Sequence, residues 1–208
     1  MSGWPSRSIL ASHLPPGNSS MPHDAREFPG PFILDACSVI CLEAAGILRR
    51  VLAILPGDCL IASAVVAEAQ WVYSWPAEDG SRHQVAIDLQ AHVSDGLLKV
   101  VTPQTEAEAE RFVQLAGPVM DDGEAMSTAI ALHRGATLVT DERIATNYCR
   151  SEGIACLSSL DMVQAWALHD QASDDEIVRA LTGIAQRARY RPPRSHALFE
   201  WWTRYVDG

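Results

Sequence analysis

The sequence has little that would suit a membrane, a secretion pathway or a surface that coats nucleic acid. No apolar run approaches the roughly 20 residues of a membrane-spanning helix. The first thirty residues lack a charged start followed by a continuous apolar segment, so no secretory signal is predicted. Positive charge is also scarce, because 16 Lys and Arg residues face 26 Asp and Glu residues, for a formal net charge of -10. We therefore expect a cytoplasmic protein that does not coat nucleic acid, which still allows an enzyme that grips RNA locally.

Cysteines and histidines lack the spacing that metal or redox sites require. No two cysteines form a Cys-x-x-Cys pair, and they lie mostly in apolar segments: Cys37, Cys41, Cys59, Cys149 and Cys156. The histidines show no His-Glu-x-x-His motif and no regular spacing: His83, His92, His133, His169 and His196. We expect buried, reduced thiols and ordinary histidines.

The length of 208 residues and the 48% hydrophobic content suit one globular domain with a substantial core. Residues 1–31 are rich in proline and glycine and lack periodicity, so we predict a flexible N-terminal extension. Residues 32–170 form the predicted domain, and residues 171–208 a C-terminal helical extension. Within that extension, residues 174–194 place apolar side chains on one face of a predicted helix, and two tryptophans follow.

Short apolar runs alternate with helical patterns along the predicted domain. The expected strands are 32–34, 59–62, 97–101, 137–140 and 154–157. The expected helices are 39–55, 63–71, 83–93, 105–116, 121–134, 143–151 and 159–169. This alternation predicts an α/β fold, with a mainly parallel central sheet between two layers of helices.

Acidic residues occur where such a sheet would bind a ligand. The stretch 121–142, DDGEAMSTAIALHRGATLVTDE, begins with acids at a helix start and ends with Asp141 and Glu142 after a strand. Asp35 follows the first strand, and Glu68 lies on an early helix. Because ligands of parallel sheets bind at the carboxyl ends of the strands, these acids are candidates for chemistry.

Each acid also has an ordinary structural interpretation. Helix capping or a first-turn position would account for most of them: Asp35, Asp121, Asp122, Glu124, and either Asp141 or Glu142. Glu68 could lie on a solvated helix face. Two carboxylates about 5 Å apart repel by roughly 3 kcal/mol at an effective dielectric constant of about 20, so a converged cluster requires a cation or protonation.

Four segments carry a resemblance to a known family. FILDACSVI, IASAVVAEA, GEAMSTAIALHRGATLVTDE and IATNYCRSEGIAC occur in order between Phe32 and Leu168. They resemble the PIN domain, a family of metal-dependent ribonucleases that includes the toxins of many bacterial toxin-antitoxin pairs. The GEA form around Glu124 is similar to a PIN subgroup with glutamate where many members carry aspartate.

The resemblance implies a site and a reaction. Its acidic quartet, both catalytic and metal-binding, would be Asp35, Glu68, Glu124 and Asp141, with Ser38, Thr140, Glu142 and Asp122 in support. The last acid often stands two residues after the threonine, so the choice between Asp141 and Glu142 stays open. The implied function is a Mg²⁺- or Mn²⁺-dependent endoribonuclease, and the role that the resemblance adds is that of a toxin with a small antitoxin partner. The alternative is a catalytically silent PIN-derived module that binds RNA or protein.

Aromatic and basic residues gather near the helical tail. Four large apolar side chains predict a homodimer, because exposed apolar patches usually find a partner: Trp166, Phe199, Trp201 and Trp202. Four arginines either follow a helix end, where cations favour the dipole, or grip RNA phosphates: Arg187, Arg189, Arg191 and Arg194.

Overall fold

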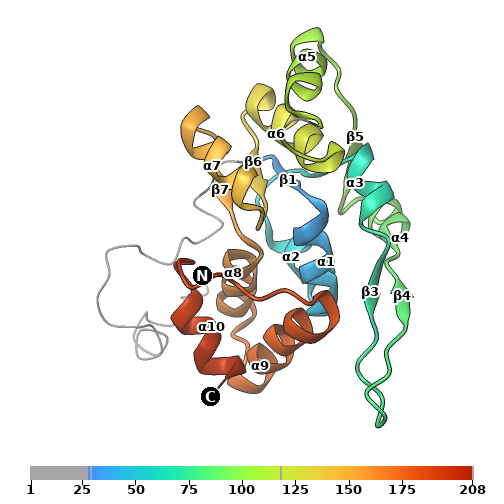
Figure 1. Cartoon of the computed structure of the whole chain (residues 1–208), viewed down its shortest axis with the longest axis vertical. Coiled ribbons are helices and arrows are strands. Elements are labelled where there is room, and N and C mark those ends of the chain that lie inside the picture. Colours follow the sequence, from blue (N-terminus) through green and yellow to red (C-terminus); the bar gives the residue numbers. More distant parts are fainter. Residues whose placement is uncertain (1–27, 29, 118, 208) are drawn as a thin grey trace, which may run out of the picture.

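A parallel five-stranded sheet forms the centre of the protein, in the order β5-β2-β1-β6-β7 (Figure 1). The computed structural model describes residues 28, 30–117 and 119–207. Its strands are β1 Phe32–Leu34, β2 Cys59–Ala62, β5 Lys99–Val101, β6 Thr137–Val139 and β7 Cys156–Leu157. The inner strands are buried along their whole length because helices cover both faces. The predicted extension 1–31 falls, except for residues 28, 30 and 31, outside the described residues.

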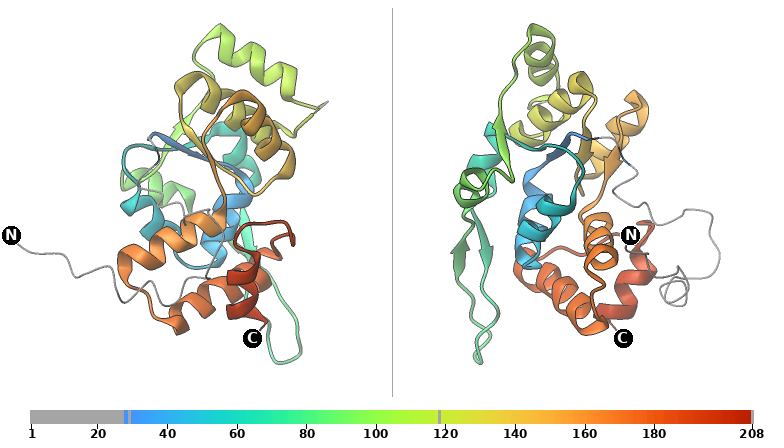
Figure 2. Two further views of the ribbon diagram at one scale, coloured as in Figure 1. Left: turned by 90° about the vertical axis from the view of Figure 1, so that its left-hand side faces the viewer. Right: turned by 180° about the vertical axis from the view of Figure 1, so that it is seen from behind.

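Helices flank the sheet on both faces, which confirms the predicted three-layer α/β/α architecture (Figures 1 and 2). They are α1 Ala36–Ala44, α2 Leu48–Ile54, α3 Ser63–Glu68, α4 Leu89–Ser94, α5 Glu106–Leu115, α6 Asp122–Arg134, α7 Arg143–Glu152 and α8 Ser159–Asp170. Helices α1, α2 and α8 pack together, whereas α6 packs against α3, α5 and α7. Among the described residues, no helix is long and apolar enough to cross a membrane.

The single helix predicted over 39–55 is two helices. Gly46, at φ 73°, ends α1, because this left-handed conformation suits glycine and stops helix propagation. The amide of Ile47 bonds back to the carbonyl of Leu42 at 3.1 Å, which completes the turn. The start of α1 also lies three residues earlier than predicted, so Asp35 is its N-cap.

A β-hairpin replaces two predicted helical segments. The helix predicted through residue 71 ends at Glu68, and the helix predicted over 83–93 is wrong in its first half. Instead β3 Trp71–Tyr73 pairs antiparallel with β4 Gln84–Ala86. The pairing partners are separated along the chain, so local periodicity could not reveal the hairpin. The hairpin projects away from the sheet (Figures 1 and 2).

The C-terminal part also differs from the prediction. The helix expected over 174–194 consists of α9 Asp174–Gly183 and a π-helical turn, η3 Ile184–Ala188, and α10 spans Phe199–Val206. Trp166, Trp201 and Trp202 are buried in the core of this chain, and Phe199 is half-buried. The apolar patch that suggested a homodimer is therefore absent from these positions, and the dimer stays a prediction.

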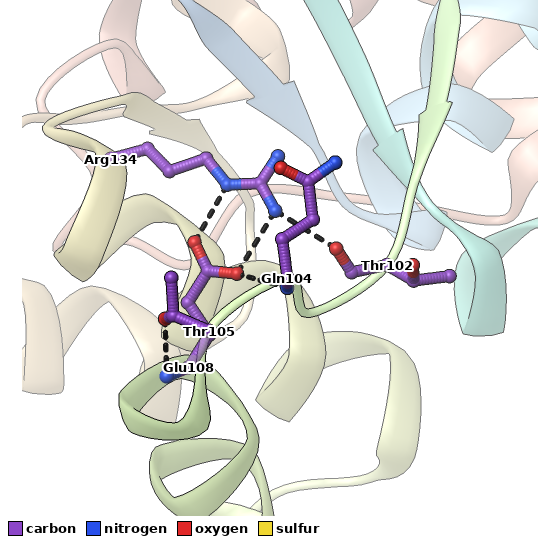
Figure 3. Close-up of polar contacts among 5 residues, drawn as sticks. All are labelled: Thr102, Gln104, Thr105, Glu108 and Arg134. Carbon is purple, nitrogen blue, oxygen red and sulfur yellow. Dashed lines mark hydrogen bonds and ion pairs between the residues drawn. The ribbon is translucent and has the colours of Figure 1, made fainter.

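A buried ion pair joins α5 to the far end of α6 (Figure 3). Arg134 donates to both carboxylate oxygens of Glu108, at 2.7 and 3.0 Å, and to the carbonyl of Thr102 at 2.8 Å. The amide of Gln104 donates to the same carboxylate at 2.6 Å. These bonds, that from Arg134 first, lower the pKa of Glu108 to about 2. The pair fixes the C-terminal end of α6 to the segment that leaves β5.

Candidate active site

The carboxyl ends of the central strands lie level with one another. Leu34 of β1 is in register with Ile61 of β2 and with Val139 of β6. The residues that follow these three strands therefore emerge at one edge of the sheet. Asp35 follows β1 directly, α3 follows β2, and Asp141 and Glu142 come shortly after β6.

Asp35 is buried at this edge and caps α1. Its Oδ1 accepts hydrogen bonds from the amide of Ser38 at 2.9 Å and from the thiol of Cys37 at 3.0 Å. Burial raises the pKa of Asp35, and hydrogen bonds, that from the Thr140 side chain first, oppose the rise. The capping interpretation is thus correct, and the second carboxylate oxygen, Oδ2, also accepts from the Cys37 thiol, at 3.2 Å.

The two predicted supporting hydroxyls lie around Asp35. Ser38 is buried, and its hydroxyl donates to the carbonyl of Val139 at 2.8 Å, which ties the start of α1 to β6. The hydroxyl of Thr140 accepts the amide of Glu142 at 3.0 Å, besides its bond with Asp35. Both hydroxyls therefore fix backbone that carries acids.

Glu68 is the last residue of α3 and points at the start of α6. Its Oε1 accepts the amide of Gly123 at 2.9 Å. A Cβ at position 123 would lie only 2.7 Å from Cδ and 2.8 Å from Oε1 of Glu68, which no ordinary contact allows. The glycine before Glu124 therefore lets the carboxylate approach the backbone of α6. Glu68 is exposed, as its solvated-face interpretation expected, yet it has a specific partner.

Glu124 is buried and reaches a different helix from the one that carries it. Its Oε1 accepts the amide of Ala145, in the first turn of α7, at 3.0 Å. Asp121 caps α6 by accepting the amide of Glu124 at 3.1 Å. Burial raises the pKa of Glu124 to about 7, opposed by the Ala145 bond and helped by the charges of Asp121, Glu142 and Asp35.

Asp141 is directed into the protein. Its Oδ1 accepts the amide of Ser159, at the start of α8, at 3.0 Å, and burial raises its pKa to about 7. Its own amide donates to the sulfur of Cys37 at 3.2 Å. Burial, and then the charge of Asp141, raise the pKa of Tyr190, which follows η3 in the chain.

Glu142, its neighbour, is exposed at the acidic edge. Burial and the charges of Asp35 and Asp121 raise its pKa. The two adjacent carboxylates therefore have different surroundings. Asp141 is directed towards α8, whereas Glu142 lies near Asp35 and Asp121, the N-caps of α1 and α6.

The acids of the edge influence one another. Burial is the main cause that raises the pKa of Glu68, Glu124 and Glu142, and the charges of Asp35 and Asp121 raise each of them further. Sequence reasoning treated Asp121 as a first-turn acid and as a capping partner of Glu124, but not as a member of the acidic site. Its position three residues before Glu124 was the available signal, because that spacing brings both to the same helix start.

Asp122, predicted as a supporting acid, is exposed in the first turn of α6. Its charge contributes to the raised pKa of Glu68, after burial and the charge of Asp121. It is therefore a peripheral member of the acidic cluster, which we define as Asp35, Glu68, Asp121, Glu124 and Glu142.

Helix N-termini hold the carboxylates in place. Asp35 bonds to the first turn of α1, Glu68 to that of α6, and Glu124 to that of α7. The positive ends of these helix dipoles offset part of the repulsion between the acids. Within the described part of the chain, no three acidic, histidine or cysteine side chains are arranged as a group that could hold a metal ion. The donors available at the acidic cluster are nevertheless all carboxylate oxygens, which fit hard cations such as Mg²⁺ or Mn²⁺.

The five cysteines do not join the acidic cluster as a metal centre. All are free, with Cys41, Cys59 and Cys149 buried and Cys37 and Cys156 half-buried, as expected for reduced thiols. Cys37 contributes only through its hydrogen bonds to Asp35 and Asp141.

Comparison with known families supports the same conclusion as the geometry. A family model, DUF3368, described as a PIN domain, matches residues 31–194, which is well over half of the chain. The chain therefore belongs to the PIN-domain family, and the predicted resemblance is confirmed. The match includes α9 and η3, so it extends beyond the predicted domain boundary at residue 170. No curated protein matches the chain.

Proposed function

We propose that this protein is a divalent-metal-dependent endoribonuclease whose acidic cluster hydrolyses RNA phosphodiester bonds. One observation carries the proposal: carboxylates from four separate segments lie near enough at the carboxyl edge of a PIN-domain sheet that the charges of Asp35 and Asp121 raise the pKa of Glu68, Glu124 and Glu142. Mutual repulsion of this kind costs stability and is retained where a cation offsets it.

Three of the proposed metal ligands are the residues predicted from sequence: Asp35, Glu68 and Glu124. For the fourth position we propose Glu142 in place of Asp141. Glu142 is exposed beside the charges of Asp35 and Asp121, whereas Asp141 is half-buried, with Oδ1 bonded to the start of α8 and Oδ2 shielded from solvent. Asp141 then acts as a positioning residue that fixes the loop after β6.

The cation, when bound, would polarise a phosphoryl oxygen and activate water. The protein's own groups orient its ligands. The amide of Ser38 and the hydroxyl of Thr140 hold Asp35, the amide of Gly123 holds Glu68, and the hydroxyl of Thr140 receives the amide of Glu142. Such fixed ligands lower the cost of organising the site at the moment of reaction.

The test is cleavage of a labelled RNA by the purified chain in Mn²⁺ and in EDTA. We expect cleavage that EDTA abolishes. Glu142→Gln should weaken Mn²⁺ binding, measured by calorimetry, by tenfold or more, while Asp141→Asn should change Mn²⁺ affinity less. The reverse ranking would return the fourth ligand position to Asp141. Absence of cleavage, with RNA still bound, would favour the binding-module alternative.

We propose that such an enzyme acts as a toxin that a small antitoxin holds inactive. We also propose that the chain belongs to the GEA-type subgroup of PIN domains. A homodimer is the second association that we propose to test, by sedimentation at micromolar concentration. Because the tryptophans of α8 and α10 are buried within this chain, a homodimer would have to form through other surfaces.

A further inference from the structure

The hairpin presents three aromatic side chains on one face. Trp71, Tyr73 and Trp75 are spaced two residues apart, and successive side chains of a strand point to opposite faces. The ladder continues past β3, because the amide of Ser74 bonds to the carbonyl of His83 at 2.8 Å. Trp71 and Trp75 are 36% and 45% exposed, which is unusual for tryptophan on a protein with its own complete core.

Arginines from the C-terminal segment lie over this aromatic face. The guanidinium of Arg189 lies 4.2 Å from the centroid of the Tyr73 ring, and that of Arg187 lies 5.7 Å from the Trp75 ring. Arg82, on the hairpin, donates to the carbonyl of Gln186 at 2.9 Å. Within the described residues none of these three arginines forms an ion pair with a carboxylate, although the chain carries a net charge of -10.

The backbone under these arginines is irregular. Arg187 lies in the π-helical turn η3, and Arg189 has a φ of 58°, a left-handed conformation rare outside glycine. Arg187 also donates to the carbonyls of Tyr73 at 3.0 Å and Ala44 at 2.8 Å, so it anchors the hairpin to α1. An anchoring role explains Arg187, but it does not explain why Arg189 and the two exposed tryptophans gather on the same face.

We propose that the aromatic face of the hairpin, formed by Trp71, Tyr73 and Trp75 with Arg82, Arg187 and Arg189, is a binding surface for single-stranded RNA. Aromatic rings stack with bases of any sequence, and arginines attract the phosphates between them. Clustered cations beside exposed aromatic rings suit a polyanion that also carries flat bases, which single-stranded RNA is. On the hairpin itself, the acids Glu78 and Asp79 lie in the turn between β3 and β4.

The surface begins beside the acidic cluster. Trp71 follows Glu68 by three residues, so the Cα atoms of the two residues are at most about 10 Å apart. From there the hairpin leads away from the sheet edge (Figures 1 and 2). A strand of RNA on this face would therefore have one end at the carboxylates. This last step rests on the proposed nuclease function, whereas the binding surface itself does not.

The test is binding of a fluorescein-labelled, unstructured 12-nucleotide RNA to the full chain in EDTA, followed by anisotropy. Trp71→Ala and Trp75→Ala should each weaken binding by about fivefold to a hundredfold. Arg189→Gln should reduce the dependence of log affinity on log salt by about 0.7. Val85→Ala is the matched control, because Val85 is 37% exposed on the opposite face of the same hairpin, and its affinity should equal that of wild type.

Several outcomes would overturn the proposal. Equal RNA affinity in wild type and both tryptophan variants would do so, as would losses of affinity matched by equal losses in Val85→Ala. Unchanged RNA binding with an altered sedimentation coefficient in Trp75→Ala would mean that the face contacts a protein, such as a second copy of the chain. Restored affinity in Trp75→Phe would support stacking, because phenylalanine keeps a ring.

The two proposals can fail separately. If the chain binds RNA in EDTA through the tryptophans but does not cleave it in Mn²⁺, the nuclease function fails and the binding surface stands. If the chain cleaves RNA and Trp71→Ala and Trp75→Ala bind and cleave as wild type does, the surface fails and the nuclease function stands.

Discussion

Glu124 offers a decisive perturbation, because its charge should destabilise the metal-free protein and stabilise the metal complex. Its pKa is about 7, against an ordinary value of 4.5. A carboxyl whose folded-state pKa is raised costs stability above its unfolded pKa, and the cost grows until the pH passes the folded-state pKa. A difference of this size corresponds to at most about 3 kcal/mol at pH 8.

Glu124→Gln should remove this cost. Glutamine keeps an oxygen for the amide of Ala145, so packing and the bond to α7 are retained. Without metal at pH 8, we expect the variant to melt up to about 6–12 °C above wild type for a domain of this size. At pH 4.5 wild-type Glu124 is largely protonated, so the two proteins should melt together.

Metal should act in the opposite direction. At ten times its dissociation constant, Mn²⁺ adds about 1.4 kcal/mol to wild type, or roughly 3–6 °C. The shift should nearly vanish in Glu124→Gln, and RNA cleavage should fall with it. Glu106→Gln is the matched control, since Glu106 is an exposed glutamate in the first turn of α5, outside the acidic cluster.

The reasoning would be refuted by equal Mn²⁺-induced shifts and equal cleavage in Glu124→Gln and wild type. It would be refuted in part if metal sensitivity fell but the metal-free variant gained nothing at pH 8, because the repulsion assigned to Glu124 would then be absent. Scanning calorimetry at pH 4.5 and pH 8, with and without Mn²⁺, resolves both results.

Two further predictions concern the ends of α6. Gly123→Ala should force Glu68 away, because the new Cβ would meet its carboxylate, so cleavage and Mn²⁺ affinity should fall tenfold or more. Its melting temperature should stay within a few degrees of wild type or rise, since alanine favours a helix; unchanged cleavage would show that Glu68 is not needed there. Arg134→Ala should cost about 3 kcal/mol at pH 7, because it leaves the buried charge of Glu108 unpaired. The lowered pKa of Glu108 contributes stability above pH 4.5 that is lost as the pH falls towards 2, so the difference in urea unfolding between Arg134→Ala and wild type should shrink at pH 3; a constant difference would contradict the charge argument.

The sequence predicts the sheet and α6 well, because their signals are local. Apolar runs between turn residues indicate the buried strands, and α6 has both its capping aspartate and a glycine stop at Gly135, which lies at φ 62°. The hairpin could not be predicted in the same way. Trp71–Tyr73 has a helical neighbour on one side, and its β conformation depends on pairing with Gln84–Ala86 and on anchoring by Arg187.

The acidic cluster is predictable in outline, since acids after parallel strands converge at one edge. Its details depend on side-chain direction, which sequence spacing does not determine. Asp141 and Glu142 are adjacent, and only the start of α8 shows that Asp141 is directed inwards. The tryptophans of α8 and α10 illustrate the same limit, because large apolar residues indicate burial without saying whether this chain or a partner covers them.

The ion pair between Glu108 and Arg134 gives α6 a second point of support. The helix has 13 residues and is about 20 Å long, with Glu124 at one end and Arg134 at the other. If the helix moves as a rigid body, a tilt of 5° about the end at Arg134 would move the end that carries Glu124 by about 1.7 Å. Displacements of about 1 Å can cost a hundredfold in rate. Under the proposed nuclease function, substitutions of Thr102, Gln104 or Glu108, which bond to one another or to Arg134, are thus a route by which the catalytic rate could be tuned over generations without any change to the carboxylates themselves.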